Sequence, residues 1–319
     1  MKPAMIAIDW GSTSARAYLL NDQGEPVSTR SEPLGVRNVP TNGFDNALNQ
    51  LCGAWLDAYP DILLFAAGMI GSRNGWHDVP YVLCPAGVSA LARGVATIET
   101  SSGKMMHIVP GVQYTALSGL HDLMRGEETQ IIGALPQDAK GARLFLLPGT
   151  HSKWVLVENR EIVWFKTFMT GELFELLRTY SLLCKVTNSS GVADANEKIY
   201  SDGMEYGLNV KHNGGSVLSR LFSVRTRGLI DGYNETQQQQ FLSGLLIGAE
   251  IADGSGILEK RGMALCHVTL IGDLGLCELY REGLVHRRFT CDIHQPPAAA
   301  NGLWAIANAM PTKVGVAYA

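Results

Sequence analysis

The sequence has no excess of positive charge and no long hydrophobic run, and each absence excludes a class of protein. Its 319 residues include 26 Lys and Arg against 30 Asp and Glu, a formal net charge of −4. Nucleic-acid binding would favour a basic stripe. No apolar run approaches the roughly 18 residues of a membrane span, and the start, M-K-P-A-M-I-A-I-D-W, does not resemble a signal peptide. We therefore expect a cytoplasmic protein with no nucleic-acid or membrane partner.

The sequence also lacks the paired cysteines of redox motifs and metal-binding modules. Its six cysteines include no C-x-x-C pair, and in a chain of this length we expect them to be reduced and mostly buried. The last three cysteines lie close in sequence to two histidines, and the group comprises Cys266, His267, Cys277, Cys291 and His294. Its spacing matches no common zinc pattern, so we predict no zinc site there.

One pattern of strands and turns occurs twice in the chain. In each copy a short apolar strand ends in a glycine turn rich in hydroxyl residues, and two further strands follow. The turns are W-G-S-T-S in the first copy and P-G-T-H-S-K in the second. The predicted strands are 5–9, 15–20 and 26–30, then 144–147, 154–157 and 162–168.

The repeat predicts two domains. Strands alternate with helical segments in both halves, and 319 residues exceed what one core usually organises. We expect two α/β domains, residues 1–138 and 139–297, facing each other across a cleft. A final helix at about 298–309 could pack back onto the first domain.

The paired glycine turns suggest phosphate binding. A turn of Gly with Ser or Thr points several backbone N–H groups in one direction, and its hydroxyls add further donors. One such turn usually marks only a hairpin, but two after buried strands could hold a polyphosphate between them. The candidate residues are Gly11, Ser12 and Thr13 in the first turn, and Gly149, Thr150, His151 and Ser152 in the second.

Charged residues accompany these turns. Asp9 ends the first strand, where a carboxylate suits a hydrated Mg²⁺ better than it suits a core, although it could also cap its own turn. Arg16 and Lys153 follow the two glycines and could neutralise phosphate charge or contact a substrate. Gly272 and Asp273 end another apolar strand, where a base or ribose could lie against small residues.

Longer strings in the sequence resemble a known family. A-I-D-W-G-S-T-S-A-R, F-L-L-P-G-T-H-S-K-W and V-T-L-I-G-D-L-G resemble the two phosphate motifs and the adenosine motif of the actin/Hsp70/sugar-kinase superfamily. G-M-I-G-S-R-N-G-W, R-G-E-E-T-Q and M-T-G-E-L-F narrow the resemblance to the 2-keto-3-deoxygalactonate kinase family, from Ala7 to about Ala307. It implies two actin-like (ribonuclease H-like) domains, with ATP and Mg²⁺ as cofactors. The implied reaction transfers the γ-phosphate to the 6-hydroxyl of 2-keto-3-deoxygalactonate, a small sugar acid.

The resemblance also implies a catalytic carboxylate. Related sugar kinases place Gly-Asp-Gln at the start of a helix before the second phosphate turn, and this chain has Gly126-Glu127-Glu128. The aspartate of the family pattern maps onto Glu127. Because glutamate is one methylene longer, Glu128 could accept the proton instead. Both glutamates also suit a helix N-terminus without any catalytic role.

An anionic substrate calls for a cation, preferably an arginine. Arg73 in G-S-R-N-G-W is the candidate for the sugar-acid carboxylate, with Asn74 and Trp76 shaping the pocket. A solvated arginine on a surface loop is the alternative.

The sequence leaves two rival functions open. A kinase of the same superfamily could act on another keto-deoxy acid or an amino sugar. A non-kinase actin-like ATPase would need a peptide-binding appendage or large insertions, for which the sequence leaves no room. Neither the number of subunits nor the preferred epimer at C4 can be read from the sequence, so a homo-oligomer stays open.

Overall fold

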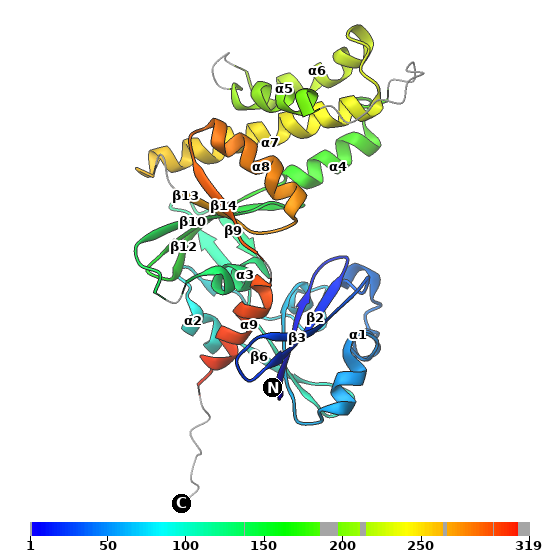
Figure 1. Cartoon of the computed structure of the whole chain (residues 1–319), viewed down its shortest axis with the longest axis vertical. Helices are drawn as coiled ribbons and strands as arrows, with labels where there is room; N and C mark the ends of the chain where they lie inside the picture. The colour runs from blue at the N-terminus through cyan, green and yellow to red at the C-terminus, as the bar shows by residue number, and fades with distance from the viewer. Residues whose placement is uncertain are drawn as a thin grey trace, which may run out of the picture. The chain divides into compact units, whose positions relative to one another are not determined.

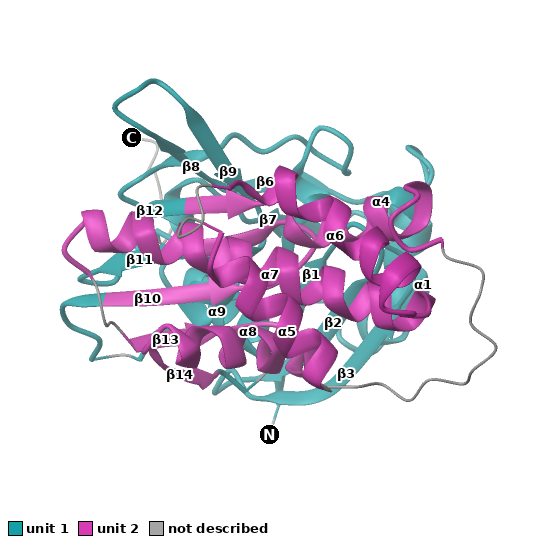
Figure 2. Cartoon of the chain, turned by 90° about the horizontal axis from the view of Figure 1, so that it is seen from above, with its two compact units in different colours: residues 1–142, 155–165, 294–319 teal, residues 143–154, 166–293 magenta. Residues whose placement is uncertain are grey.

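The computed structural model describes residues 2–136, 138–185, 197–210, 215–263, 267–295 and 297–311. The mixed α/β fold is confirmed, with helices and strands alternating along the chain (Figure 1). The chain divides into two compact units (Figure 2). Unit 1 contains Met1–Ala142, Val155–Phe165 and His294–Ala319, and unit 2 contains Arg143–Trp154 and Lys166–Ile293. A domain boundary between 138 and 139 stays a prediction.

Unit 1 is built on a sheet with the strand order β3-β2-β1-β4-β7-β6. Neighbours β1, β2 and β3 are antiparallel, whereas β4 runs parallel to β1 and β7 parallel to β4. A smaller sheet has the order β5-β8-β9. The bounds are β1 Pro3–Trp10, β2 Ala15–Asn21, β3 Pro26–Glu32, β4 Leu63–Gly68, β5 Val82–Leu83, β6 Ala96–Glu99, β7 Met105–Ile108, β8 Val112–Thr115 and β9 His121–Met124.

Helices of unit 1 cover this sheet with apolar faces that the sequence already indicates. In α1 the buried residues Phe44, Leu48, Leu51 and Trp55 recur every three or four positions, as in one face of a helix. They join the core formed by the inner strands of the sheet. The helices are α1 Phe44–Ala58, α2 Val88–Arg93, α3 Glu127–Ala134 and α9 Ala298–Asn308, with 3₁₀ turns at Val36–Asn38 and Met69–Gly71.

The second sheet confirms the internal repeat. Its order is β12-β11-β10-β13-β14, in which the first four positions follow the same plan as β3-β2-β1-β4. As in the first sheet, the fourth strand runs parallel to the first of its set, here β13 to β10, and β14 continues parallel to β13. The bounds are β10 Ala142–Leu147, β11 Ser152–Glu158, β12 Glu161–Phe168, β13 His267–Leu270 and β14 Thr290–Ile293.

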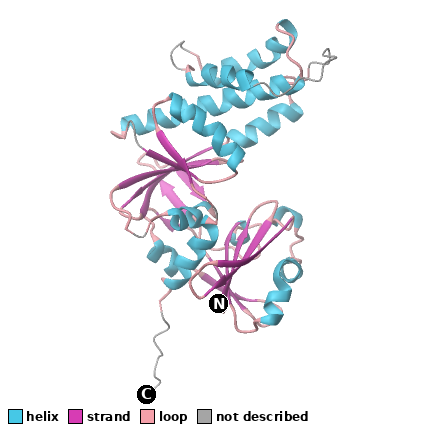
Figure 3. Ribbon diagram, viewed as in Figure 1, coloured by secondary structure: helices cyan, strands magenta, loops and turns pink. Residues whose placement is uncertain are grey.

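Unit 2 adds a layer of helices, in which α5, α6 and α7 lie side by side (Figures 1 and 3). In the described part of the chain, only α7 is long and apolar enough to cross a membrane, but 78% of its most apolar stretch is buried in the protein. It is the central helix of the layer. The bounds are α4 Thr170–Tyr180, α5 Glu197–Leu208, α6 Val217–Ile230, α7 Glu235–Lys260 and α8 Leu274–His286.

Glycines bring α5 and α7 into backbone contact. A Cβ atom added to Gly203 would lie 2.3 Å from the carbonyl oxygen of Phe241, and one added to Gly244 would lie 2.2 Å from that of Tyr200. Real side chains do not approach so closely, so only glycine permits this crossing. Gly207 and Gly248, one helical turn further along, make equivalent contacts.

Glycines also bring α3 and α9 of unit 1 into backbone contact. A Cβ on Gly133 would lie 1.9 Å from the carbonyl oxygen of Ala298, and a Cβ on Gly302 would lie 1.8 Å from that of Thr129. The helix near the end of the chain therefore packs backbone to backbone against α3. Contacts of α9 with β1 and β4 place it over the sheet of unit 1.

We expect Gly302→Ala to destabilise the protein by about 1–3 kcal/mol, because the methyl group forces α3 and α9 apart. This loss exceeds the gain of up to about 1 kcal/mol that alanine brings to a helix. Urea unfolding curves measure the difference. Asn301→Ala, at an exposed position of the same helix, is the control and should unfold close to wild type. An unchanged midpoint for Gly302→Ala would contradict the close packing.

Candidate active site

In unit 1, polar residues gather where three strands meet. Asp9, near the end of β1, is the register partner of Arg16 on β2 and of Ala67 on β4. The next residue of β4, Gly68, has a φ of +92°, and a Cβ there would lie 2.7 Å from the carbonyl oxygen of Trp10. A side chain at this position would also come within 3.5 Å of Oδ1 of Asp9. Glycine therefore keeps space open beside the carboxylate.

Opposing influences act on the pKa of Asp9, and their net effect is to raise it. Burial raises the pKa of its carboxyl, while Arg16 and a hydrogen bond from Gln130 lower it and Glu127 raises it. The Gln130 bond, from Nε2 to Oδ2 of Asp9, is long at 3.5 Å. These interactions join Asp9, Arg16, Glu127 and Gln130 into one polar cluster, drawn from two strands and the first turns of α3.

Helix α3 begins close to the end of β4. Gly126 precedes the helix with a φ of +105°, and a Cβ there would lie 3.2 Å from the Cα of Gly68. Glu127, the first residue of α3, is half-buried, and its Oε2 accepts a hydrogen bond from the backbone N–H of Arg125 at 2.9 Å. The two glycines thus let the carboxylate of Glu127 approach the strand end that carries Asp9.

Glu128 has a different environment. Its side chain is fully buried and folds back onto the start of the helix. Its carboxyl accepts the N–H of Gly126, at 3.0 and 2.7 Å to its two oxygens, and the hydroxyl of Thr129 at 2.9 Å. Burial first, and then the nearby Glu127, raises the pKa of Glu128 to about 8. This carboxyl therefore holds its proton at neutral pH and is a poor proton acceptor.

The first glycine turn is held by the segment that follows β3. The N–H groups of Val36 and Arg37 donate to the carbonyl oxygens of Gly11 and Ser12, at 3.0 and 2.9 Å. The side chain of Asn38 donates to the carbonyl of Thr13 at 2.9 Å. With its carbonyls engaged in this way, the turn has a fixed backbone.

The segment after β4 contains the three predicted substrate residues, in different settings. The Arg73 side chain is 92% exposed, and its Nε lies 3.6 Å from Oδ2 of Asp78. Asn74 is also exposed. Trp76 instead stacks on Phe44, with ring centroids 5.9 Å apart, and packs edge-on against Trp10. Trp76 is thus part of the core packing, whereas Arg73 and Asn74 lie on the surface.

In unit 2, the second glycine turn contacts the start of α4. A Cβ on Gly171 would lie 2.4 Å from the carbonyl oxygen of Gly149, and the N–H of Glu172 donates to the carbonyl of Thr150 at 3.0 Å. The side chains of His151 and Glu172 also form a hydrogen bond. Lys153 is buried, and its Nζ donates to the carbonyl of His151 at 2.7 Å.

A buried carboxylate lies under this turn. Glu250, in the middle of α7, accepts hydrogen bonds from Ser152 Oγ at 2.7 Å and from Trp154 Nε1 at 2.8 Å on one oxygen. Its other oxygen accepts the hydroxyl of Tyr280 at 2.6 Å. Burial raises the pKa of Glu250, and these bonds, with one from Thr170, lower it. Glu250 therefore ties the turn to α7 and α8.

The predicted adenosine element lies next to the turn. A Cβ on Gly272 would be 3.4 Å from the carbonyl oxygen of Pro148, the residue before Gly149. Asp273 caps α8, its Oδ1 accepting the N–H of Leu276 at 3.0 Å. The structure thus places Gly272 against Pro148, at the start of the turn, while the observed contact of Asp273 is that of a helix cap.

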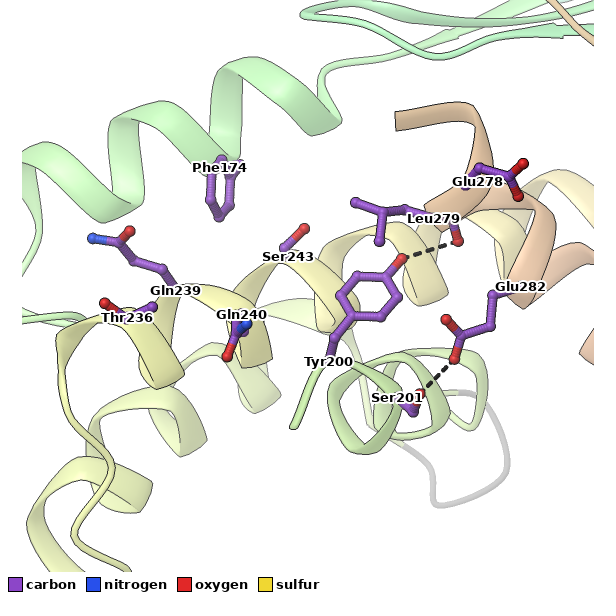
Figure 4. A pocket seen from close by; sticks show the side chains of 10 residues that line it. All are labelled: Phe174, Tyr200, Ser201, Thr236, Gln239, Gln240, Ser243, Glu278, Leu279 and Glu282. Atoms are coloured by element: carbon purple, nitrogen blue, oxygen red, sulfur yellow. Dashed lines mark hydrogen bonds between the residues drawn. The ribbon is translucent and has the colours of Figure 1, made fainter. Parts of the chain in front are cut away.

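A pocket of about 600 Å³ opens between α4, α5, α7 and α8 (Figure 4). This volume is in the usual range for small-molecule sites. Inside it, Tyr200 donates to the carbonyl of Leu279 at 3.0 Å and Ser201 to Glu282 at 2.5 Å. Helix α4 also carries Gly171 in its first turn, and Asp273 is the N-cap of helix α8. The lining residues are Phe174, Tyr200, Ser201, Thr236, Gln239, Gln240, Ser243, Glu278, Leu279 and Glu282.

Sequence reasoning missed several of these residues. The pocket combines four helices that are far apart in the sequence, and Glu250 resembles any polar residue of a long helix. Gln130 could have been identified from the sequence, since it lies one turn after Glu127 on the same helix face. Arg125 could have been identified as well, because it is the first residue of R-G-E-E-T-Q. Among the described residues, no group of three or more His, Cys, Asp or Glu is arranged to bind a metal; Cys266 lies outside them.

Comparison with known proteins identifies close similarities over almost the whole chain. A model of the 2-keto-3-deoxy-galactonokinase family matches residues 9–306. The 2-dehydro-3-deoxygalactonokinase of Escherichia coli (strain K12) is 34% identical over 295 residues, 92% of either chain. DgoK1 of Rhizobium meliloti (strain 1021), assigned the same activity, is 33% identical over 282 residues, covering 87% of this chain and 88% of the relative.

Solved structures agree with these matches. The crystal structure of a Sinorhizobium meliloti protein assigned as a 2-dehydro-3-deoxygalactonokinase superposes with a TM-score of 0.83 at 30% identity, covering 96% of this chain and 98% of that one. Component A of the (R)-2-hydroxyglutaryl-CoA dehydratase of Acidaminococcus fermentans shares the fold, with a TM-score of 0.50 at 15% identity over 97% of this chain and 99% of that one.

Proposed function

The chain belongs to the 2-keto-3-deoxy-galactonokinase family, and from that membership we propose its reaction. The enzyme transfers the γ-phosphate of ATP to the 6-hydroxyl of 2-keto-3-deoxygalactonate, giving ADP and 2-keto-3-deoxy-6-phosphogalactonate. The observation that carries the proposal is the family match over residues 9–306, which includes the Asp9 strand end, the start of α3 and both glycine turns. We place the reaction in the cytoplasm.

Glu127 is the proposed proton acceptor. The oxygen of the 6-hydroxyl attacks the γ-phosphorus, the bond to the β–γ bridging oxygen breaks, and the hydroxyl proton passes to a carboxylate. Glu127 is half-buried and lies in the cluster of Asp9 and Arg16. Glu128 is buried, and its pKa of about 8 keeps it protonated. These differences favour Glu127 of the two candidates.

The two glycine turns are the proposed phosphate sites. Gly11, Ser12 and Thr13 would offer N–H and hydroxyl groups from unit 1, as would the turn Gly149–Ser152 from unit 2. Arg16 and Lys153 supply positive charge, which stabilises the transferring phosphoryl group. That both turns serve one ATP, in a cleft between two domains, stays a prediction.

Asp9 is the proposed contact for Mg²⁺. Magnesium in kinases keeps several waters and uses one or two carboxylates besides the phosphates, so a three-carboxylate cage is not required. A carboxylate at a strand end, with space kept open by Gly68 and with Glu127 near, fits such a hydrated ion. Bound there, magnesium would neutralise negative charge on the phosphates.

The nucleoside is assigned to unit 2. Gly272 and Asp273 are the proposed ribose and base contacts, because Gly272 adjoins the residue before the second glycine turn. The pocket of Figure 4 extends from the same two helices and offers the ring of Phe174 and the amides of Gln239 and Gln240. Aromatic and amide groups are suited to a planar base with hydrogen-bonding edges.

An acceptor comparison tests this function. ADP release from Mg²⁺-ATP is followed in a coupled assay with 2-keto-3-deoxygalactonate, with its gluconate epimer, with N-acetylglucosamine and without acceptor. We expect the highest kcat/KM for the galactonate acid and a much lower rate without acceptor. A preference for N-acetylglucosamine would indicate an amino-sugar kinase instead. ADP release that is independent of the acceptor would indicate an ATPase and refute the proposal.

A further inference from the structure

Arg125 is a buried cation that the proposed mechanism does not use. It directly follows β9, two residues before the start of α3, and it is only 8% exposed. In the described part of the chain no carboxylate lies within ion-pair distance of its guanidinium. Two of its three nitrogens, Nε and Nη1, are shielded from solvent and have no hydrogen-bond partner.

The contacts that Arg125 does make leave its charge unpaired. Its Nη2 donates to the carbonyl oxygen of Val79 at 2.6 Å, and the guanidinium lies over the ring of Tyr81, 4.3 Å from the centroid. A carbonyl and an aromatic face attract a cation but do not neutralise it. A buried charge without a counter-ion is costly, and donors left without acceptors add to that cost. The site is therefore suited to an anion.

The position of Arg125 connects the proposed base with the segment after β4. Its backbone N–H donates to Oε2 of Glu127 at 2.9 Å. On the other side, Gly71 lies so close that a Cβ on it would come within 2.9 Å of Nη1. An anion bound by the side chain would thus be held by the same residue whose backbone N–H contacts the proposed base.

We propose that Arg125 binds the carboxylate of the sugar acid. This assignment rests on the proposed function, which makes the substrate an anion with a hydroxyl at its other end. The carboxylate accepts a hydrogen bond from Nη1, the unpartnered nitrogen that faces Gly71, and segment 71–81 shifts as it enters, because this nitrogen is covered in the free protein. Substrate binding thereby neutralises the buried charge.

Arg73 is the competing residue. Its side chain is 92% exposed and faces Asp78 at 3.6 Å, so its charge is already solvated and partly matched. An exposed ion pair contributes little to binding energy. A buried arginine without a counter-ion gains more from the same carboxylate, which is why we favour Arg125.

The test compares the sugar acid with its neutral carboxamide in wild type, Arg125→Gln, Arg125→Lys and Arg73→Gln. We expect Arg125→Gln to lower kcat/KM for the acid roughly 10- to 150-fold, the loss of a charged hydrogen bond, with little change for the carboxamide. The preference for the acid should therefore collapse. Arg125→Lys, which keeps the charge and most of the packing, should retain part of it, and Arg73→Gln should retain nearly all.

Three outcomes would overturn the assignment. An equal loss for acid and carboxamide in both Arg125 variants would mean that the arginine only supports the fold. A collapse of the preference in Arg73→Gln would transfer the role to Arg73. If Arg125→Gln does not fold, an unaltered acid preference in Arg125→Lys, together with unaltered thermal stabilisation by the acid without ATP, would refute the role. Wild type that does not phosphorylate the acid would instead refute the proposed function.

Discussion

Glu127→Gln is expected to lower kcat about 10²- to 10⁴-fold, the usual contribution of general base catalysis, while the KM for ATP changes little. The amide has nearly the shape of the carboxylate and can still accept the N–H of Arg125 through its oxygen. It cannot take up the proton of the attacking hydroxyl. The loss should therefore appear in the chemical step, which single-turnover measurements of product formation with saturating ATP and sugar acid isolate.

Glu128→Gln is the matched control for this prediction. With a pKa of about 8, Glu128 is protonated at neutral pH, and a glutamine reproduces its neutral form. Its amide oxygen, in the place of Oε1, can accept from both Gly126 and Thr129, as Oε1 of Glu128 does. We expect nearly full activity in Glu128→Gln. If this variant lost activity and Glu127→Gln kept it, the base would be Glu128; if both kept it, the reaction would need no carboxylate base.

Glu250→Leu is expected to have the largest effect on stability, at least about 3 kcal/mol, because buried donors left without an acceptor each cost about 1–3 kcal/mol. The donors are the side chains of Ser152, Trp154 and Tyr280. Since Ser152 belongs to the second glycine turn, we also expect a raised KM for ATP in the protein that remains folded. Urea unfolding and ATP titration measure the two effects.

Two further variants distinguish the loss of the hydrogen bonds to Glu250 from the general effect of a substitution in α7. Glu259→Leu changes an exposed glutamate of the same helix and should shift the unfolding free energy by less than about 0.5 kcal/mol. Glu250→Gln keeps one acceptor oxygen and should fall between Glu250→Leu and wild type. Equal stability of Glu250→Leu and Glu259→Leu would show that the hydrogen bonds around Glu250 contribute nothing measurable.

The sequence predicts those parts of the fold whose signals are local. The strands around Gly11 and Gly149 are recognisable because an apolar run ends in a turn that glycine permits, and α1 because its apolar residues follow the helical period. Helix α5 has no comparable local signal. Its sequence, E-K-I-Y-S-D-G-M-E-Y-G-L, contains two glycines that weaken an isolated helix. They are tolerated because Gly203 and Gly207 allow the contact with α7.

The site shows the same limit. Asp9 and Glu127 could be selected from short motifs, although their roles stay predictions. The different environments of Glu127 and Glu128 could not be predicted, because they depend on which carboxyl folds back onto Gly126 and is buried. The surroundings of Arg73 and Arg125 could not be predicted either. Both lie in motif strings, and only the tertiary structure exposes one guanidinium and buries the other.

The glycine contact between α3 and α9 has a consequence for the order of synthesis. Helix α3 is complete in the nascent chain by residue 134, but its packing partner α9 starts only at residue 298. Until the ribosome has made those intervening residues, the α3 face around Gly133 lacks the neighbour that fits against it. Unit 1 thus combines α3 with α9, the last helix of the described chain. A kinase built in this way acquires the native packing of α3 only after α9 has been synthesised, so chains released earlier would lack this packing.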